Sequence, residues 1–368
     1  QMVALSASPA TCCRVCGVSG APTRTLTPQT LQQVADDAES ATIWLRDRVY
    51  ALRGGATPIR TPSPIASAVN PHAMEMEIAA LPPDAHLLAS GDLDVYCTEA
   101  AQMPSVLEEI GRLREVTFRA VGEGTGNPTD VDRFDRHYLH LFVWNRARRE
   151  IAGAYRIGRT DVIVAQHGIK GLYTSTLFRF DARLISALSP ALELGRSFVR
   201  AEYQRHSNAL LLLWKAIGRF VVRSSRYAVL FGAVSISRHY ADTSRQLMLA
   251  FLQQHREDVR LARLVSPLHP PQRMPLPAHL AAQPLQDAAA ADALVARIQA
   301  DGQGMPVLLR QYLRLDARLL GFNVDPQFGD ALDALMAVDL RRVEPAILRR
   351  YLGRDGAAIF SRSDAAAA

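Results

Sequence analysis

The sequence predicts an α/β fold with a mixed central sheet, and two stretches of the chain carry that prediction. Residues 138–144 and 150–157 are strand-like runs joined by a short polar turn, which is typical of a β-hairpin and requires antiparallel pairing. Residues 192–200 and 227–236 are also strand-like, and the helical segment between them requires a parallel pair with a right-handed crossover. A sheet that holds both kinds of pairing is mixed and has helices on its faces.

The other elements follow from apolar periodicity and from capping residues. We expect 171–180 to be extended, and 332–340 fits either a strand or a helix. The remaining expected elements are a strand at 92–98, a helix that begins at Pro104 and stops at the glycine-rich turn 122–126, a helix after Asn208, and helices at 242–254, 287–299, 306–320 and 341–351.

Composition divides the chain into an irregular N-terminal extension and one main domain. The expected parts are a disordered segment at 1–26, a helix at 27–55, a proline-rich linker at 56–73, a main domain at 74–355 with a proline-rich insertion at 266–284, and a tail at 356–368.

The net charge of +6 over 368 residues favours acidic partners, such as phosphates, an acidic carrier protein or an anionic membrane face. No zinc-finger spacing or RNA-binding motif points to nucleic acid. Cys12, Cys13 and Cys16 lack a second pair or a nearby His, so no metal site is expected. No apolar run approaches the roughly 20 residues of a membrane span. Without a signal segment at the start, we expect a cytoplasmic protein, with peripheral contact to the inner membrane face as a further option.

The stretch 192–199 places Glu193 and Arg196 three residues apart inside an apolar strand. Glu and Arg are rarely buried unless they are paired. The two residues therefore indicate either a structural ion pair or an active site, and this stretch alone does not separate the two readings.

Several longer segments occur in order along the chain: GRLREVTFRAVGEGTG, DVDRFDRHYLHLFVW, GAYRIGRT, GLYTSTLF, ALELGRSFVRAEYQ, LLLLWKAIGRF, LFGAVSIS and LLRQYLRLDARLLGF. In these segments the chain resembles GNAT-superfamily N-acyltransferases of the ornithine-lipid synthase and hemolysin-like family. The resemblance covers about residues 74–355. It implies a GNAT-like mixed, mostly antiparallel sheet, in which the helix after the central strand cradles the pyrophosphate or phosphopantetheine of a thioester donor.

Four further motifs stand along the chain: an Arg-x-x-x-Phe helix (Arg114, Phe118), an Asp-x-x-Asp (Asp132, Asp135), an Arg that closes the hairpin (Arg156) and a Glu-x-x-Arg on the central strand (Glu193, Arg196). In these motifs the chain is more distantly similar to acyl-homoserine-lactone synthases. The usual GNAT donor-loop signature, Gln/Arg-x-x-Gly-x-Gly/Ala, is absent, which favours an acyl carrier protein over CoA as the donor.

The helix at 27–55 resembles the tail of a phospholipid-type O-acyltransferase domain, which precedes the GNAT part in bifunctional relatives. The His-x4-Asp motif of that domain is missing, so we expect no O-acylation.

The resemblance and general chemistry together suggest roles for the site residues. An amine must lose a proton before it attacks, and Glu193 is the first candidate for the general base, with Asp135 the second. Arg156 and Arg196 could hold the carboxylate of an amino acid or pair with Asp135 or Glu193. Arg114 and Asp132 are further candidates for binding the substrate. The acyl donor would meet backbone N–H groups near Phe198 and Val199, and a phosphate would meet Arg205, Ser207 and Asn208 at the start of the next helix.

The expected function is transfer of a fatty acyl chain, 3-hydroxylated in the family, from acyl carrier protein or CoA to an amino acid, with ornithine as the first candidate. No bound cofactor is expected. The alternatives are an autoinducer-like synthase that acylates another amine and a non-catalytic module that binds a membrane or a carrier protein. Lys215, Arg219 and Arg223 line one helix face, which is either a docking site for an acidic partner or an ordinary solvated face.

Overall fold

The computed structural model describes residues 62–204, 208–272, 276–277, 280, 285 and 287–361. The expected disordered segment at 1–26 and the expected helix at 27–55 lie outside the described residues, as do Arg205 and Ser207.

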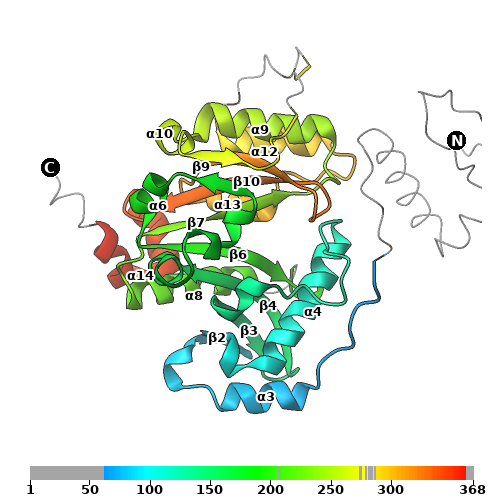
Figure 1. Cartoon of the computed structure of the whole chain (residues 1–368), viewed down its shortest axis with the longest axis vertical. Coiled ribbons are helices and arrows are strands. Elements are labelled where there is room, and N and C mark those ends of the chain that lie inside the picture. The colour runs from blue at the N-terminus through cyan, green and yellow to red at the C-terminus, as the bar shows by residue number, and fades with distance from the viewer. Residues whose placement is uncertain are drawn as a thin grey trace, which may run out of the picture. The chain divides into compact units, whose positions relative to one another are not determined.

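An eight-stranded sheet forms the centre of the described chain, with its strands in the order β1-β2-β3-β4-β6-β7-β10-β9 (Figure 1). β6 and β7 pair in parallel, whereas the other neighbouring strands of this sheet pair antiparallel. The predicted mixed, mostly antiparallel sheet is therefore confirmed. Its strands are β1 (His86–Ser90), β2 (Leu93–Glu99), β3 (Leu139–Asn145), β4 (Glu150–Arg159), β6 (Ala191–Val199), β7 (Val229–Ile236), β9 (Arg318–Asp325) and β10 (Ala331–Asp339). A second, small sheet is formed by β5 (Phe178–Phe180) and β8 (Val265–Pro267).

Helices cover both faces of the large sheet, because alternate residues of its strands are apolar on each side. One face, which we call the α8 face, packs against α8 (Ala209–Arg223), α9 (Asp242–Arg256), α12 (Ala288–Ile298), α13 (Val307–Arg314) and α14 (Pro345–Ser361). The opposite face, the α4 face, packs against α3 (Pro71–Ala79), α4 (Pro104–Ala120), α5 (Thr160–His167), α6 (Ala182–Leu188) and α10 (Val259–Ala262). The short helix α7 (Ala201–Gln204) follows β6.

Two sequence-based expectations about elements are wrong. The segment 171–180 is extended only in β5, and half of it lies in the 3₁₀ turns η4 (Ile169–Gly171) and η5 (Tyr173–Thr176). The expected helix at 306–320 ends at Arg314, because Asp316 adopts a left-handed backbone conformation with φ of 52° and the chain then enters β9. The ambiguous segment 332–340 is the strand β10, which pairs with β7 on one side and β9 on the other.

Candidate active site

The strands β6 and β7 run side by side for only a short distance. Their register covers Ala191 to Glu193 on β6 and Val229 to Phe231 on β7, although both strands continue beyond that point. A Cβ atom on Gly232 would lie 2.1 Å from the carbonyl oxygen of Leu194, so only glycine permits the close approach of the strands where they begin to part. The divergence leaves space inside the sheet.

A β-bulge on β6 lies next to that space. Between the pairs Ala154–Phe198 and Arg156–Gly195, β6 has one residue more than β4. Arg196 takes up the extra length with φ of 50°, a left-handed conformation that costs a non-glycine residue energy. Bulges redirect side chains and free backbone groups from the ladder, and strained residues cluster at functional sites.

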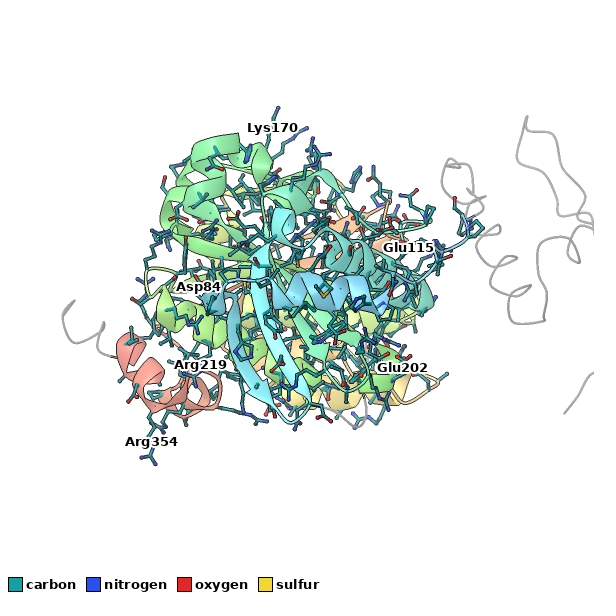
Figure 2. The ribbon with its side chains drawn as sticks, turned by 90° about the horizontal axis from the view of Figure 1, so that it is seen from below. Asp84, Glu115, Lys170, Glu202, Arg219 and Arg354 are labelled. Atoms are coloured by element: carbon teal, nitrogen blue, oxygen red, sulfur yellow. The ribbon has the colours of Figure 1, made fainter. Side chains whose placement is uncertain are left out.

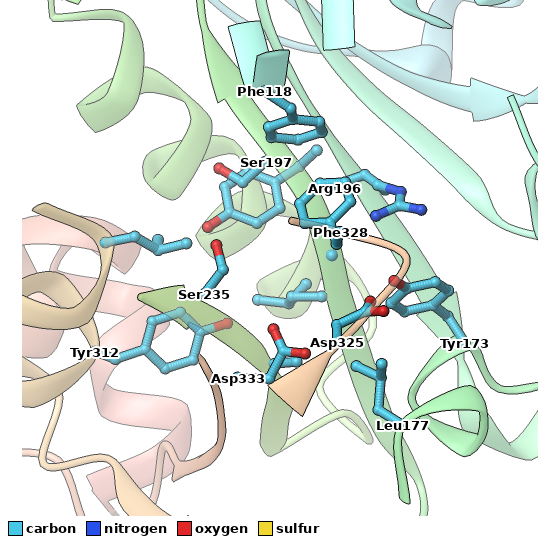
Figure 3. Close-up of a pocket in the computed structure, with 15 residues that line it drawn as sticks. Phe118, Tyr173, Leu177, Arg196, Ser197, Ser235, Tyr312, Asp325, Phe328 and Asp333 are labelled. Carbon is cyan, nitrogen blue, oxygen red and sulfur yellow. The ribbon is translucent and has the colours of Figure 1, made fainter. Parts of the chain in front are cut away.

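A cavity of about 70 Å³ occupies the gap between β6 and β7 (Figure 3). Its lining on the α8 face is aromatic and aliphatic and comes from Tyr155, Leu194, Leu308 and Tyr312. On the α4 face, Arg196 and Tyr173 line the cavity together with Phe118, Leu177 and Phe328, and the carboxylates of Asp325 and Asp333 also reach it. The cavity therefore joins an apolar side to a charged side through the sheet.

Alanine substitutions at the two glycines of the divergence should affect stability differently. We expect Gly232→Ala to lower the free energy of unfolding by about 1–3 kcal/mol, because the added methyl group meets backbone that cannot move aside locally. A Cβ atom on Gly195 has nothing within 4 Å, so Gly195→Ala should fold as stably as the wild type while it narrows the cavity. Chemical denaturation of both variants measures the difference. Equal stabilities of the two variants would contradict the close approach of Gly232 to the backbone of Leu194.

Arg196 joins the cavity to a group of carboxylates behind it. Its Nε lies 3.2 Å from Oδ2 of Asp130 and its Nη2 lies 3.7 Å from Oδ2 of Asp132. The guanidinium group also lies over the rings of Tyr173 and Phe328, at 4.7 and 4.9 Å from their centroids. Flat contact with aromatic rings holds the planar guanidinium in one orientation.

Asp135 is the centre of a buried ion network. Its Oδ1 accepts hydrogen bonds from Arg114 Nη1 at 2.8 Å and from Arg156 Nη1 at 3.2 Å, and Arg156 Nη1 also donates to Asp132 at 2.7 Å. Burial alone would raise the pKa of Asp135, but Arg114 and Arg156 outweigh it and hold that pKa far below its ordinary value. Both arginines are fully buried, and neither lines the cavity. The network holds the loop around Asp132 against β4.

Two neighbours complete that network. The capping box of η3 (Arg133–Arg136) joins Asp132 and Asp135 through each other's backbone N–H groups. Burial, reinforced by Arg114, lowers the pKa of His140 to about 4, so this histidine is neutral near pH 7 and its Nε2 donates to the backbone carbonyl of Asp135.

Glu193 does not face the cavity. Its carboxylate is buried and accepts hydrogen bonds from the Tyr138 hydroxyl, from the backbone N–H of Tyr173 at 3.2 Å and from that of Thr174 at 2.6 Å. The ion pair with Arg196, one of the two readings of this stretch, is not formed, because the bulge turns Arg196 toward Asp130 and Asp132. Glu193 thus fixes the turn η5, which places Tyr173 at the cavity.

The sequence analysis missed the carboxylates on the β9–β10 side of the cavity. Asp325 and Asp333 are 8% and 5% exposed, and Glu123 lies nearby with its Oε2 accepting a hydrogen bond from Ser235 Oγ at 2.8 Å. Burial raises the pKa of all three, that of Glu123 to about 7. A carboxylate in the middle of the apolar run 331–338 was the available indication for Asp333.

The residues expected to bind the acyl donor are distributed along β6 and the start of α8. Phe198 and Val199 pair with Ala154 and Gly153 of β4, beyond the bulge, and do not line the cavity. Asn208 is exposed at the N-cap position of α8, where its side chain makes no capping hydrogen bond.

The basic residues on α8 lie at its outer surface. Lys215, Arg219 and Arg223 are exposed, and Arg223 donates to the backbone carbonyl of Asp84 at 2.8 Å. The helix α8 packs against α14, and Figure 2 shows Arg219 and Arg354 at the outer surface. Within the described part of the chain, no helix is long and apolar enough to span a bilayer, and no group of three or more His, Cys, Asp or Glu side chains is arranged to hold a metal ion.

Comparison with known proteins relates this geometry to a family. Residues 113–215, which run from α4 through β6 to the middle of α8, match the family model described as an acetyltransferase (GNAT) domain. The chain is 35% identical over 262 residues to a glycine N(alpha)-acyltransferase of Bacteroides thetaiotaomicron, an alignment that covers 67% of this chain and 77% of that protein. It is 32% identical over 257 residues to a glycine N(alpha)-acyltransferase of Phocaeicola vulgatus, with 64% and 77% covered.

A solved structure is also similar in outline. A CoA-dependent acyl-homoserine lactone synthase with SAM and isopentyl-CoA aligns over 72% of this chain and 97% of its own, with 13% identity and a TM-score of 0.37. The identity to the two Bacteroides and Phocaeicola proteins is high enough, over enough of each chain, to show common descent. The chain is a GNAT-fold acyltransferase and belongs to the N-acyltransferase family that includes these two proteins.

Proposed function

We propose that this chain transfers a fatty acyl group from a thioester donor to the α-amine of an amino acid. The observation that carries the proposal is the cavity through the sheet, which is apolar on the α8 face and charged on the α4 face. An acyl chain and a zwitterionic amino acid require these two environments, and they must meet where the new amide bond forms. We therefore place the acyl group on the α8 face and the amino acid on the α4 face.

On the donor side, the bulge in β6 supports a role in stabilising charge. The thioester carbonyl becomes an oxyanion, which requires N–H donors held in place. Backbone at residues 195–197 is closer to the cavity than Phe198 and Val199, and we assign the oxyanion site to this bulge. The start of α8, with Arg205, Ser207 and Asn208, remains our proposal for binding the phosphates of the donor.

On the acceptor side, we assign the substrate carboxylate to Arg196, whose guanidinium lines the cavity. A second group of charged residues supports Arg196 and does not contact the substrate. These residues form hydrogen bonds and ion pairs with one another, and they hold the loop that orients Arg196: Arg114, Arg156, Asp132 and Asp135. Glu193 has a positioning role in this proposal, since its oxygens hold the turn that carries Tyr173.

Glycine is our first candidate for the acceptor, on the basis of the two relatives named as glycine N(alpha)-acyltransferases. Ornithine is the second candidate, and a specific observation favours it: the cavity has two carboxylates, Asp325 and Asp333, and ornithine would bring a second ammonium group. An aminolipid would be the product in either case.

The donor's carrier is a separate part of the proposal. Acyl carrier proteins are acidic, and the exposed residues Lys215 and Arg219 on α8, with Arg354 on α14, supply positive charge on one side of the molecule. An anionic membrane surface would meet the same residues.

The test supplies the purified chain with a 3-hydroxyacyl or plain fatty acyl thioester, on carrier protein or on CoA, together with glycine, ornithine or S-adenosylmethionine. We expect thiol release that depends on the amino acid, with the N-acyl product identified by mass spectrometry. Turnover with S-adenosylmethionine alone would support an autoinducer-like synthase instead. Binding of carrier protein or anionic vesicles without thiol release would support a non-catalytic module.

A further inference from the structure

We propose that Asp333 binds the ammonium group of the acceptor amino acid and accepts a proton from it, as the general base of the reaction. This inference rests on the proposed function. Asp333 belongs to β10, at the far edge of the cavity from the β6 bulge. Neither the sequence motifs nor the family match at 113–215 reaches this residue.

The strand register places Asp333 at the cavity. It lies opposite Ser235 of β7 and opposite Asn323 of β9, and Ser235 also lines the cavity. Figure 3 shows its carboxylate pointing toward the cavity centre, beside Tyr312 and below Ser235. The side chain is only 5% exposed, and its Oδ2 has no hydrogen-bond partner among the described residues. A buried carboxylate oxygen that points into a cavity without a donor requires a ligand that supplies one.

The charges around Asp333 specify a cation as that ligand. Two further carboxylates face it, Asp325 from the end of β9 and Glu123 from the turn after α4, and Asn323 and Tyr173 are its uncharged polar neighbours. Arg196 is the cation that faces it, and that guanidinium also interacts with Asp130 and Asp132. The β9–β10 side of the cavity therefore gathers three carboxyl groups near one guanidinium group, and a substrate ammonium group would favour their ionised forms.

The protonation behaviour of Asp333 agrees with this role. Burial, followed by the charges of Asp325 and Glu123, raises its pKa well above the ordinary value for aspartate, while Arg196 and Asn323 act in the opposite direction. A carboxylate of raised pKa is a stronger base once it is ionised, and an approaching ammonium group favours that ionised form, from which proton transfer can proceed.

The other carboxylates of the site are less suited to this step. Glu193 is outside the cavity lining, and its oxygens accept three hydrogen bonds. Asp135 is held ionised between two arginines, which makes it a weak base. Asp325 lines the cavity but accepts the backbone N–H of Gln327 at 2.9 Å.

The step balances as follows. The acceptor ammonium gives one proton to Asp333, and the lone pair of the resulting amine forms the C–N bond to the thioester carbonyl carbon. The C–S bond then breaks, its electron pair leaves on sulfur, and the second proton from nitrogen ends on that sulfur as a thiol. Asp333 returns its proton to solvent, so acyl thioester and amino acid yield N-acyl amino acid, thiol and one proton.

The experiment measures Asp333→Asn with glycine and with ornithine as acceptors. We expect kcat/KM to fall by about 100-fold or more with both, which is the usual contribution of a general base. Thermal stability should be equal to or above that of the wild type, because the variant removes an unpaired buried carboxylate and keeps its shape. Circular dichroism of the purified variant checks the fold, and the Tm reports the relief of buried charge independently of turnover.

Glu123→Gln is the matched control. It removes a neighbouring negative charge, keeps an oxygen that can accept from Ser235, and does not touch the cavity lining. We expect the acidic limb of its kcat/KM profile to move to lower pH, because Asp333 loses a neighbouring charge that raises its pKa. If Asp333 had only a structural role, Glu123→Gln would leave the acidic limb of kcat/KM at the pH found for the wild type.

Three results would overturn the proposal. If kcat/KM of Asp333→Asn stays within about threefold of the wild-type value, Asp333 is not the general base. A loss confined to ornithine would assign Asp333 to the side-chain ammonium group rather than to the reacting one. Absence of thiol release by the wild type with every amine would overturn the proposed function itself, and this inference with it.

Discussion

Asp135→Asn is expected to lower the free energy of unfolding by about 3–5 kcal/mol, which is the usual cost of breaking a buried ion pair from one side. The substitution leaves the fully buried guanidinium groups of Arg114 and Arg156 without the carboxylate that accepts hydrogen bonds from both. An amide oxygen can accept one of these bonds, but it supplies no charge to balance two cations. Urea denaturation, followed by circular dichroism, measures the change.

The matched control is Asp316→Asn, which also breaks two ion pairs with arginines. Asp316 contacts Arg256 and Arg318 at 2.8 and 2.9 Å, but its side chain is 38% exposed. Exposed ion pairs are worth about 0–1 kcal/mol, and asparagine tolerates the left-handed backbone found at this position. A loss at Asp135 no larger than the loss at Asp316 would show that the buried network does not hold the fold.

The same residue predicts how stability depends on pH. The pKa of Asp135 is lower in the folded chain than in the unfolded chain, where it is about 3.9. The ionised carboxylate therefore contributes its full stabilisation above about pH 4, and the contribution falls away as the pH drops below that value. Urea midpoints measured from pH 3 to pH 7 should fall steeply at the acid end for the wild type and more gently for Asp135→Asn.

The parts of the fold that depend on local pattern could be predicted from the sequence. The hairpin of β3 and β4 and the parallel pair of β6 and β7 follow from strand-like runs and from what lies between them. The start of β9 could not be predicted, because the apolar spacing of residues 306–320 continues through the turn at Asp316. Tertiary pairing with β10, rather than local preference, makes the end of that segment a strand.

The site was predicted only in part, for a related reason. The charged residues around Asp135 were identified, and the structure brings Arg114, Asp132, Asp135 and Arg156 together. An ion pair between Glu193 and Arg196 was one of the two readings of the central strand, and the extra residue in β6 turns the two side chains apart. Asp333 is more than 130 residues from Arg196 along the chain. Only the order of β7 and β10 in the sheet places it at the same cavity.

Glu193→Gln is expected to act through the turn η5 rather than through the chemical step. The glutamine amide can offer its oxygen to one of the two backbone N–H groups, of Tyr173 and Thr174, but its NH₂ group then faces the other. Loss of a hydrogen bond to a charged group costs about 1.5–3 kcal/mol of stability. The turn should shift, and Tyr173 should leave its position 4.7 Å from the guanidinium group of Arg196.

The kinetic consequence separates positioning from catalysis. We expect KM for the amino acid to rise about tenfold, with single-turnover acyl transfer at saturating amino acid within about threefold of the wild type. Tyr138→Phe is the matched control, because it removes the hydroxyl that donates to Glu193 and accepts the backbone N–H of Tyr173 at 2.8 Å, but it leaves both backbone hydrogen bonds to the Glu193 carboxylate in place. It should cost less stability than Glu193→Gln and should change KM less. Unchanged stability together with a lost single turnover in Glu193→Gln would instead make Glu193 the base, and Asp333 would then be left to bind the ammonium group without accepting its proton.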